Sequence, residues 1–253
     1  MKFRTLSRLI YLIRSGHRRG HGIHSPFLFR LITTVIEERE TLPEYIKFKE
    51  LVINALQLLN STSDHQYEKV YQQFNLKVFN PDELYKKVEL PLRYSKILFR
   101  LARFFKPSSV INWGPAFGVN LGVLAMADRF ANVYQVINDH EFVFFCRELL
   151  KDPVFSNIRF LTEYQEIQGV TEFVIINWPY DTEKSRQIVQ KCINRHGDND
   201  VLIIRGIHES KEMESMWLET LSDKCLFVSL DLFEIGIVFF HKGLQKENFI
   251  IRF

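Results

Sequence analysis

From residue 108 onwards, short runs of apolar residues alternate with longer segments in which apolar residues recur every three or four positions. Apolar runs of this length predict buried strands, and the longer periodic segments predict helices. We expect strands at 110–113, 133–138, 158–161, 172–177 and 201–204, and helices at 120–131, 141–150, 182–194 and 211–221. This alternation predicts a mostly parallel sheet that is covered by helices on both faces.

The C-terminal part of the chain has a different pattern. Apolar runs at 226–233, 236–240 and 249–253 follow one another through short connections. Connections that are too short to hold a crossover helix join antiparallel strands. The whole pattern therefore predicts a Rossmann-like α/β domain whose parallel sheet ends in an antiparallel hairpin.

Residues 1–82 are predicted to form a helical extension that precedes the α/β domain at 83–253. A first helix is indicated within residues 1–15 by apolar residues at helical spacing, which are Phe3, Leu6, Leu9, Ile10 and Ile13. We expect this apolar face to pack on the rest of the protein, as most amphipathic helices do. Contact with an anionic membrane or with RNA is the alternative interpretation. Further helices are expected at 27–36 and 93–105.

Composition excludes several classes of protein. Hydrophobic residues make up 46% of the 253 residues, which is too many for a disordered chain. The three cysteines are widely spaced and form no CxxC pair, so neither a disulfide framework nor a zinc site is predicted. No apolar run is long enough to cross a bilayer, and Arg4, Arg8 and Arg14 interrupt the segment where a signal peptide would be apolar. We therefore expect a cytoplasmic protein.

The formal net charge of +3 conceals a basic N-terminal region. Residues 1–36 contain seven basic residues and no acidic one, whereas the rest of the chain contains 26 basic and 30 acidic residues. The acidic body argues against extensive nucleic-acid binding. Residues 16–24 add three glycines and three histidines without an acidic or cysteine ligand. We expect a structural turn there, with an anion-binding turn as the alternative.

The best candidate for a ligand site is the first strand–helix turn of the α/β domain. In a doubly wound sheet, ligands bind at the carboxyl ends of the strands, beside this turn. Here the turn spans 112–118 and contains Gly114 and Gly118. Glycine permits a tight bend and lets a ligand approach the N–H groups at the helix N-terminus closely.

Four stretches of the chain carry a resemblance: GHGIHSPF at 20–27, the segment 98–107, the glycine turn, and the segment from 231 to 253. The first and the last of these are distinctive. In these stretches the chain resembles a group of bacteroidete class I S-adenosylmethionine-dependent methyltransferases. The resemblance implies the Rossmann-like class I methyltransferase fold, with a seven-stranded sheet. It also implies that S-adenosylmethionine binds at the glycine turn.

The resemblance further implies a set of cofactor-binding residues, which are Asn112, Gly114, Ala116, Gly118, Asn138, Asp139 and Asn177. Similar proteins carry acidic residues on the first and second strands and after the fourth, where this chain has Asn112, Ile137 and Asn177. The acid of the second strand ordinarily accepts hydrogen bonds from both ribose hydroxyls, which an isoleucine cannot do. Asp139 follows Ile137 by two residues and is the alternative acceptor.

Other candidate residues follow later strands. Arg205–Gly206 stands in the place of an acidic pair, so no magnesium or other metal site is expected. His208 and His140 are candidate general bases, with a surface or capping role as the alternative for each. Trp178 and Tyr180 are expected either to line a substrate pocket or to fill the core.

These observations predict a metal-independent methyltransferase that uses S-adenosylmethionine and acts on a small-molecule or protein acceptor. The loss of several acidic positions leaves a second interpretation open, which is a catalytically inactive pseudo-methyltransferase that binds a partner. A homo-oligomer is compatible with both interpretations.

Overall fold

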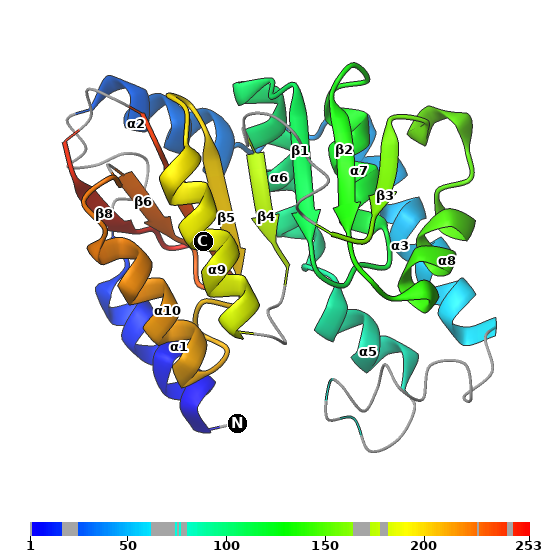
Figure 1. Ribbon diagram of the computed structural model, residues 1–253, viewed down its shortest axis with the longest axis horizontal. Helices are drawn as coiled ribbons and strands as arrows, with labels where there is room; N and C mark the ends of the chain where they lie inside the picture. Colours follow the sequence, from blue (N-terminus) through cyan, green and yellow to red (C-terminus); the bar gives the residue numbers. More distant parts are fainter. Residues whose placement is uncertain are drawn as a thin grey trace. The chain divides into compact units, whose positions relative to one another are not determined.

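The computed structural model describes residues 2–16, 25–61, 74, 76, 80–163, 173–177, 182–226, 228–241 and 245–253 (Figure 1). Most of the histidine- and glycine-rich segment, together with Trp178 and Tyr180, lies outside the described residues. The chain forms two compact units. Unit 1 contains Met1–Arg39, Ser109–Ile111 and Gln168–Phe253, and unit 2 contains Glu40–Ser108 and Asn112–Ile167.

Unit 1 holds the C-terminal strands, whose hydrogen-bonded order is β4-β5-β7-β6-β8. Their bounds are β4 Phe173–Ile176, β5 Val201–Arg205, β6 Val228–Asp231, β7 Ile235–Phe239 and β8 Glu247–Ile250. Strands β4 and β5 run parallel, and β7 runs antiparallel to both β5 and β6. The predicted antiparallel hairpin is therefore confirmed for β6 and β7.

The last strand differs from the prediction of a further antiparallel strand. Strand β8 pairs parallel with β6, with Val228 opposite Glu247 and Asp231 opposite Ile250. Strand β7 already has β5 and β6 as its two neighbours. Strand β8 therefore pairs with the open edge of β6 and runs in the same direction as β6. Within the described residues the strands number eight, one more than the resemblance implied. The Rossmann-like α/β class is confirmed.

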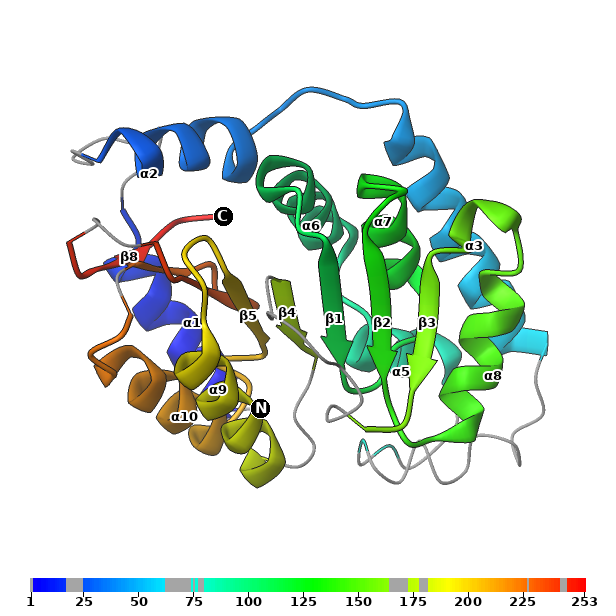
Figure 2. The ribbon, with the colours of Figure 1, turned by 45° about the horizontal axis from the view of Figure 1, so that its top comes forward.

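The described helices of unit 1 are α1 Lys2–Arg14, α2 Pro26–Leu31, the π-helical turn η2 Ile32–Ile36, α9 Thr182–Arg195 and α10 Lys211–Ser222. Helix α2 starts as the sequence predicts, because Ser25 is its N-cap and Pro26 takes its first position. Helices α9 and α10 lie side by side (Figure 2), and Arg186 donates a hydrogen bond to Glu219 at 2.9 Å. No helix within the described residues is both long enough and apolar enough to span a membrane.

Unit 2 carries the strands β2 Asn132–Val136 and β3 Ile158–Leu161, which run parallel. Strand β1 spans Ser109–Trp113, and its last two residues, Asn112 and Trp113, belong to this unit. Strand β1 lies next to β2. The helices are α3 Glu44–Ser61, α5 Pro81–Val88, α6 Leu92–Phe105, α7 Val119–Ala127 and α8 His140–Leu149, with the 3-10 turn η4 Pro153–Phe155. Helix α7 is buried from Val119 to Ala125 and packs on α6. The turn that precedes α7 is therefore carried by a rigid element.

Helix α1 packs on unit 1 through the face opposite to the predicted one. The hydroxyl of Tyr11, which is 4% exposed, donates a hydrogen bond to the carbonyl of Ile251. Arg4 forms ion pairs of 2.6 Å with both Glu209 and Glu234. Phe3 is half-buried. The other four apolar residues that were expected to cover the core are instead exposed, with Leu6 at 58%, Leu9 at 56%, Ile10 at 42% and Ile13 at 76%. The face of α1 that is buried is the one whose polar side chains bind Ile251, Glu209 and Glu234.

Candidate cofactor site

The turn between β1 and α7 depends on two glycines. Gly114 and Gly118 have φ angles of 109° and 100°, in the left-handed region that other residues seldom adopt. A Cβ atom at Gly118 would also lie 3.1 Å from Cδ1 of Leu150. The prediction of a glycine-dependent bend is confirmed, and Gly118 is the N-cap residue of α7.

A buried glutamate between α5 and α6 holds this turn in place. Glu89 is 1% exposed, and its Oε1 accepts a hydrogen bond from the N–H of Phe117 at 2.7 Å. Its Oε2 accepts from Nδ2 of Asn120 at 2.6 Å and from the N–H of Asn120 at 3.3 Å. Oδ1 of Asn120 in turn accepts from the hydroxyl of Ser95 at 2.7 Å. The carboxylate satisfies N–H groups at the N-terminus of α7, where the helix dipole favours negative charge.

Two other N–H groups of the turn have no protein partner. Within the described residues, the N–H groups of Ala116 and Gly118 meet no hydrogen-bond acceptor, although both residues are buried. Buried N–H groups without an acceptor are rare in folded proteins, and a ligand or water commonly satisfies them. The turn therefore offers two backbone donors to a bound molecule.

The side chain of Asn112, at the position of the first expected acid, is bound within unit 2. Its Nδ2 donates to Oε1 of Gln135 at 2.6 Å, and Nε2 of Gln135 donates to the carbonyl of Gly114 at 2.6 Å. Asn112 is 1% exposed and Gln135 is fully buried. The two amides satisfy each other in a place where an unpaired carboxylate would be costly to bury. They join β1, β2 and the glycine turn.

The residues after β2 offer one carboxylate to the site. Ile137 is 5% exposed, so the position of the second expected acid is filled by a buried apolar side chain. Asp139 is the N-cap of α8, because its Oδ1 accepts hydrogen bonds from the N–H groups of Glu141 at 3.0 Å and Phe142 at 3.4 Å. Within the described part of the chain, Oδ2 of Asp139 accepts no hydrogen bond. Asn138, between them, is exposed.

The corresponding residues of unit 1 form a buried polar pair. Asn177 follows β4 and is 2% exposed, and Arg205 ends β5 and is 5% exposed. Nη1 of Arg205 donates to Oδ1 of Asn177 at 3.0 Å. A guanidinium thus occupies the place in which similar sequences carry acids, and its positive charge repels a divalent cation. In the described part of the chain, no three His, Cys, Asp or Glu side chains are arranged to hold a metal ion.

The two candidate bases have different surroundings. His140 is the exposed first residue of α8. His208 lies in unit 1, where its Nδ1 bonds Glu214 at 3.0 Å and its Nε2 bonds Asp231 at 2.8 Å. Burial alone would lower the pKa of His208, but hydrogen bonds and charges from Asp231, and then from Glu214, outweigh it and raise the pKa. Because both ring nitrogens are already hydrogen-bonded to carboxylates, the geometry favours a structural role for His208.

Sequence reasoning missed three residues that build the turn: Glu89, Gln135 and Cys146. The thiol of Cys146, on α8, donates to the carbonyl of Ala116 at 3.1 Å. Burial raises the pKa of the Cys146 thiol well above its ordinary value, and the negative charge of Glu89 raises it further. The thiol therefore stays protonated and supports the turn. For Glu89, the available signal was a single acid inside the apolar run 88–92.

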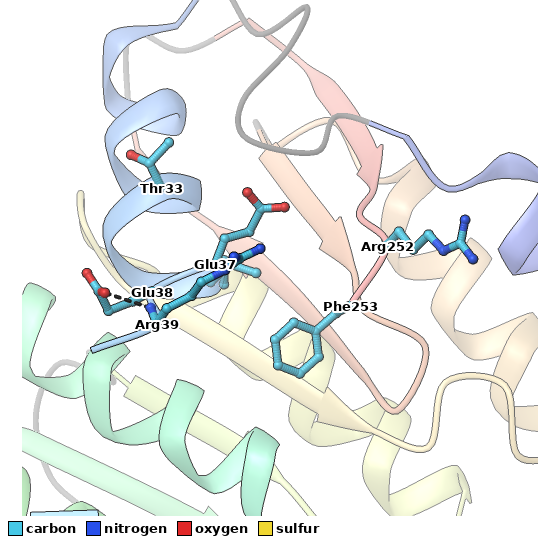
Figure 3. A pocket seen from close by; sticks show the side chains of 7 residues that line it. Thr33, Glu37, Glu38, Arg39, Arg252 and Phe253 are labelled. Atoms are coloured by element: carbon cyan, nitrogen blue, oxygen red, sulfur yellow. Dashed lines mark hydrogen bonds between the residues drawn. The ribbon is translucent and has the colours of Figure 1, made fainter. Parts of the chain in front are cut away.

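The described part of unit 1 has a small cavity of about 100 Å³ beside α9 and α10 and two larger ones. One of the larger cavities, of about 610 Å³, is lined by Thr33, Ile36, Glu37, Glu38, Arg39, Arg252 and Phe253. Figure 3 shows that Arg252 and Phe253 point in opposite directions from the chain. The other, of about 390 Å³, lies between α1, α10, β6 and β8 and has His208 in its wall. Neither contains a residue that the resemblance implies for the cofactor.

No protein-family model matches this chain, and no curated protein matches its sequence. Solved structures match its fold. The SAH-bound methyltransferase PaMTH1 from Podospora anserina has a TM-score of 0.55 at 11% identity, covering 81% of this chain and 100% of that one. The O-methyltransferase from Bacillus cereus in complex with SAH gives 0.52 at 12%, covering 71% and 92%.

A third match is the O-methyltransferase TomG from Streptomyces achromogenes in complex with SAM, which is involved in tomaymycin synthesis. Its TM-score is 0.51 at 12% identity, and the match covers 71% of this chain and 91% of that one. Similarity at such low identity is similarity of fold. This chain therefore has the class I methyltransferase fold.

The role of Glu89 can be tested by the substitution Glu89→Gln. An amide nitrogen would then face the N–H donors of Phe117 or Asn120, so we expect the free energy of unfolding to fall by about 2 kcal/mol. Urea denaturation measures this change. The control Glu50→Gln, at an exposed position of α3, should change stability by less than about 0.5 kcal/mol. Equal stability of the two variants would contradict a structural role for Glu89.

The raised pKa of His208 predicts a pH-dependent contribution to stability. A group whose pKa is higher in the folded state stabilises the fold fully below its unfolded pKa, and the contribution is lost as pH rises through the folded pKa. Denaturation of wild type and His208→Gln should therefore differ most below the ordinary pKa of 6.5, and the difference should shrink above it. His140→Gln, at an exposed histidine, is the control. A difference that does not change with pH would disprove the assignment.

Proposed function

We propose that this chain binds S-adenosylmethionine at the glycine turn and transfers its methyl group, without a metal, to a small-molecule or protein acceptor. The observation that carries the proposal is the pair of buried N–H groups of Ala116 and Gly118, which have no acceptor within the described residues. They lie at a helix N-terminus, which is suited to binding an electronegative group of a ligand. The SAH- and SAM-bound proteins of the same fold support this choice of ligand.

The remaining residues of the proposed site fit the cofactor in part. Oδ2 of Asp139 is available as an acceptor for a ribose hydroxyl, with the exposed Asn138 beside it. Asn112 supports the turn through Gln135. Because Ile137 replaces an acid, one charged hydrogen bond is lost, and we expect binding to be about 10- to 150-fold weaker than with an acid there.

When bound, the cofactor supplies an electrophilic methyl group. The protein then needs chiefly to hold an acceptor atom in line with that group and to exclude competing geometries. We propose Trp178 and Tyr180 as substrate-pocket residues, because they follow the fourth strand in the sequence. Arg205 supports a metal-independent site, because its buried guanidinium occupies the place of the expected acidic pair.

A second candidate function is that of a pseudo-methyltransferase that binds a protein partner. The side chains of Asn112 and Asn177 favour it, because each is hydrogen-bonded inside its own unit, to Gln135 and Arg205 respectively. Side chains that are satisfied in this way have less capacity to bind a cofactor. The two functions differ in one measurable property, which is the affinity for S-adenosylmethionine.

Calorimetric titration with S-adenosylmethionine and S-adenosylhomocysteine tests the proposal. We expect wild type to bind both, and Ile137→Asp to bind at least about tenfold more tightly, because the variant restores a carboxylate acceptor for the ribose. The matched control Ile137→Asn has nearly the same shape without the charge and should show a smaller gain. ATP, as an unrelated adenine nucleotide, controls for nonspecific binding.

Heat of binding followed by methyl transfer in an acceptor screen would support the enzyme. Absence of binding by wild type and by Ile137→Asp, at ligand concentrations up to about millimolar, would reject the cofactor site and favour the pseudo-methyltransferase. Thermal denaturation of each variant must first show that it is folded.

A further inference from the structure

Helix α1 presents an exposed apolar face that no described part of the chain covers. This face, called here the α1 apolar face, consists of Leu6, Leu9, Ile10 and Ile13, whose side chains are 58%, 56%, 42% and 76% exposed. Their spacing of three and four residues places them on one side of the helix. Single exposed leucines are ordinary, but a contiguous apolar face on a surface helix marks a contact site.

The α1 apolar face cannot turn inwards, because the other side of the helix is fixed to unit 1. Ser7 is 6% exposed and Tyr11 is 4% exposed. The hydroxyl of Tyr11 donates to the carbonyl of Ile251 and accepts from the N–H of Phe253 at 3.2 Å. The ion pairs of Arg4 fix the same side. The apolar side therefore faces outwards in the folded protein.

Apolar residues of α10 lie beside the α1 apolar face and enlarge the apolar surface. Helix α10 lies along α1, and both line the cavity of about 390 Å³, whose walls include Ile10, Leu218 and Leu221. Leu218 is itself 59% exposed. Acidic side chains close to α1 are already paired, Glu214 with His208 among them. Apolar side chains, with Arg14 beside them, thus line this side of α1.

The positive charge of the N-terminal region indicates which kind of surface the α1 apolar face contacts. Arg14 is exposed on α1, and residues 1–36 contain seven basic residues and no acidic one. The guanidinium of Arg8 lies over the Phe233 ring at 5.8 Å. A second copy of the chain packed face to face would bring these like charges together, which is unfavourable. An anionic lipid surface attracts arginines while it accepts apolar side chains below the headgroups.

We propose that the α1 apolar face docks this protein on anionic membrane surfaces. The helix lies in the plane of the interface, with Leu6, Leu9 and Ile13 towards the acyl chains. Arg14, at its flank, contacts the lipid headgroups. Such an arrangement would bring unit 1 to the membrane without any membrane-spanning segment, and it does not depend on the proposed cofactor site.

Cosedimentation of the full chain with vesicles tests this proposal. We expect binding to mixed phosphatidylcholine and phosphatidylglycerol vesicles, and much weaker binding to phosphatidylcholine alone. Raising the salt concentration well above about 0.1 M should weaken the binding, since screening then acts over less than ~10 Å. The double variant Leu9→Ser/Ile13→Ser should lower the partition coefficient at least about tenfold.

Matched controls separate docking from general loss of apolar surface or charge. Ile46 and Ile53 of α3 are 62% and 53% exposed, so Ile46→Ser/Ile53→Ser should leave vesicle binding unchanged. Arg14→Gln should weaken binding to anionic vesicles about fivefold, whereas Lys49→Gln on α3, also exposed, should not. Unchanged thermal midpoints would show that all variants are folded.

Three outcomes would overturn the proposal. The first is that wild type does not cosediment with anionic vesicles. The second is that the α3 pair loses as much binding as the α1 pair. The third is that sedimentation velocity shows a dimer that Leu9→Ser/Ile13→Ser dissociates while vesicles bind neither protein, which would assign the α1 apolar face to self-association.

Discussion

The buried carboxylate of Glu89 is the interaction on which the candidate site depends. It binds the N–H of Phe117 and both nitrogens of Asn120, and so fastens the start of α7 to the segment between α5 and α6. With these donors satisfied, the backbone at Gly114 and Gly118 holds its left-handed bend. The N–H groups that stay available are therefore fixed in position before any ligand arrives, which reduces the entropic cost of binding.

Neutral amides and one guanidinium stand at positions where acidic residues were expected. The Asn112–Gln135 and Asn177–Arg205 pairs are each satisfied within their own unit. Each pair gives its buried asparagine a hydrogen-bond partner, which lowers the cost of burying that side chain. The same positions therefore offer no carboxylate that could bind a ribose or a metal ion.

Much of the fold could be predicted from the sequence, because apolar runs and helical periodicity report burial directly. The positions of strands β1 to β7 along the chain and the need for glycine at Gly118 were anticipated in this way. The parallel pairing of β8, the partner of Glu89 and the inverted face of α1 were not, because each depends on long-range contacts. The amphipathic pattern of α1 does not show that Arg4 pairs with Glu209 and Glu234, or that Tyr11 binds Ile251.

The measurement that tests the central claim most directly is amide hydrogen exchange by NMR, with and without saturating S-adenosylhomocysteine. The account predicts that exchange of the Ala116 and Gly118 N–H groups slows markedly on binding, because each gains an acceptor. The Phe117 N–H, already held by Glu89, should change less. Unchanged exchange at Ala116 and Gly118 in the presence of bound ligand would contradict the claim that this turn is the cofactor site.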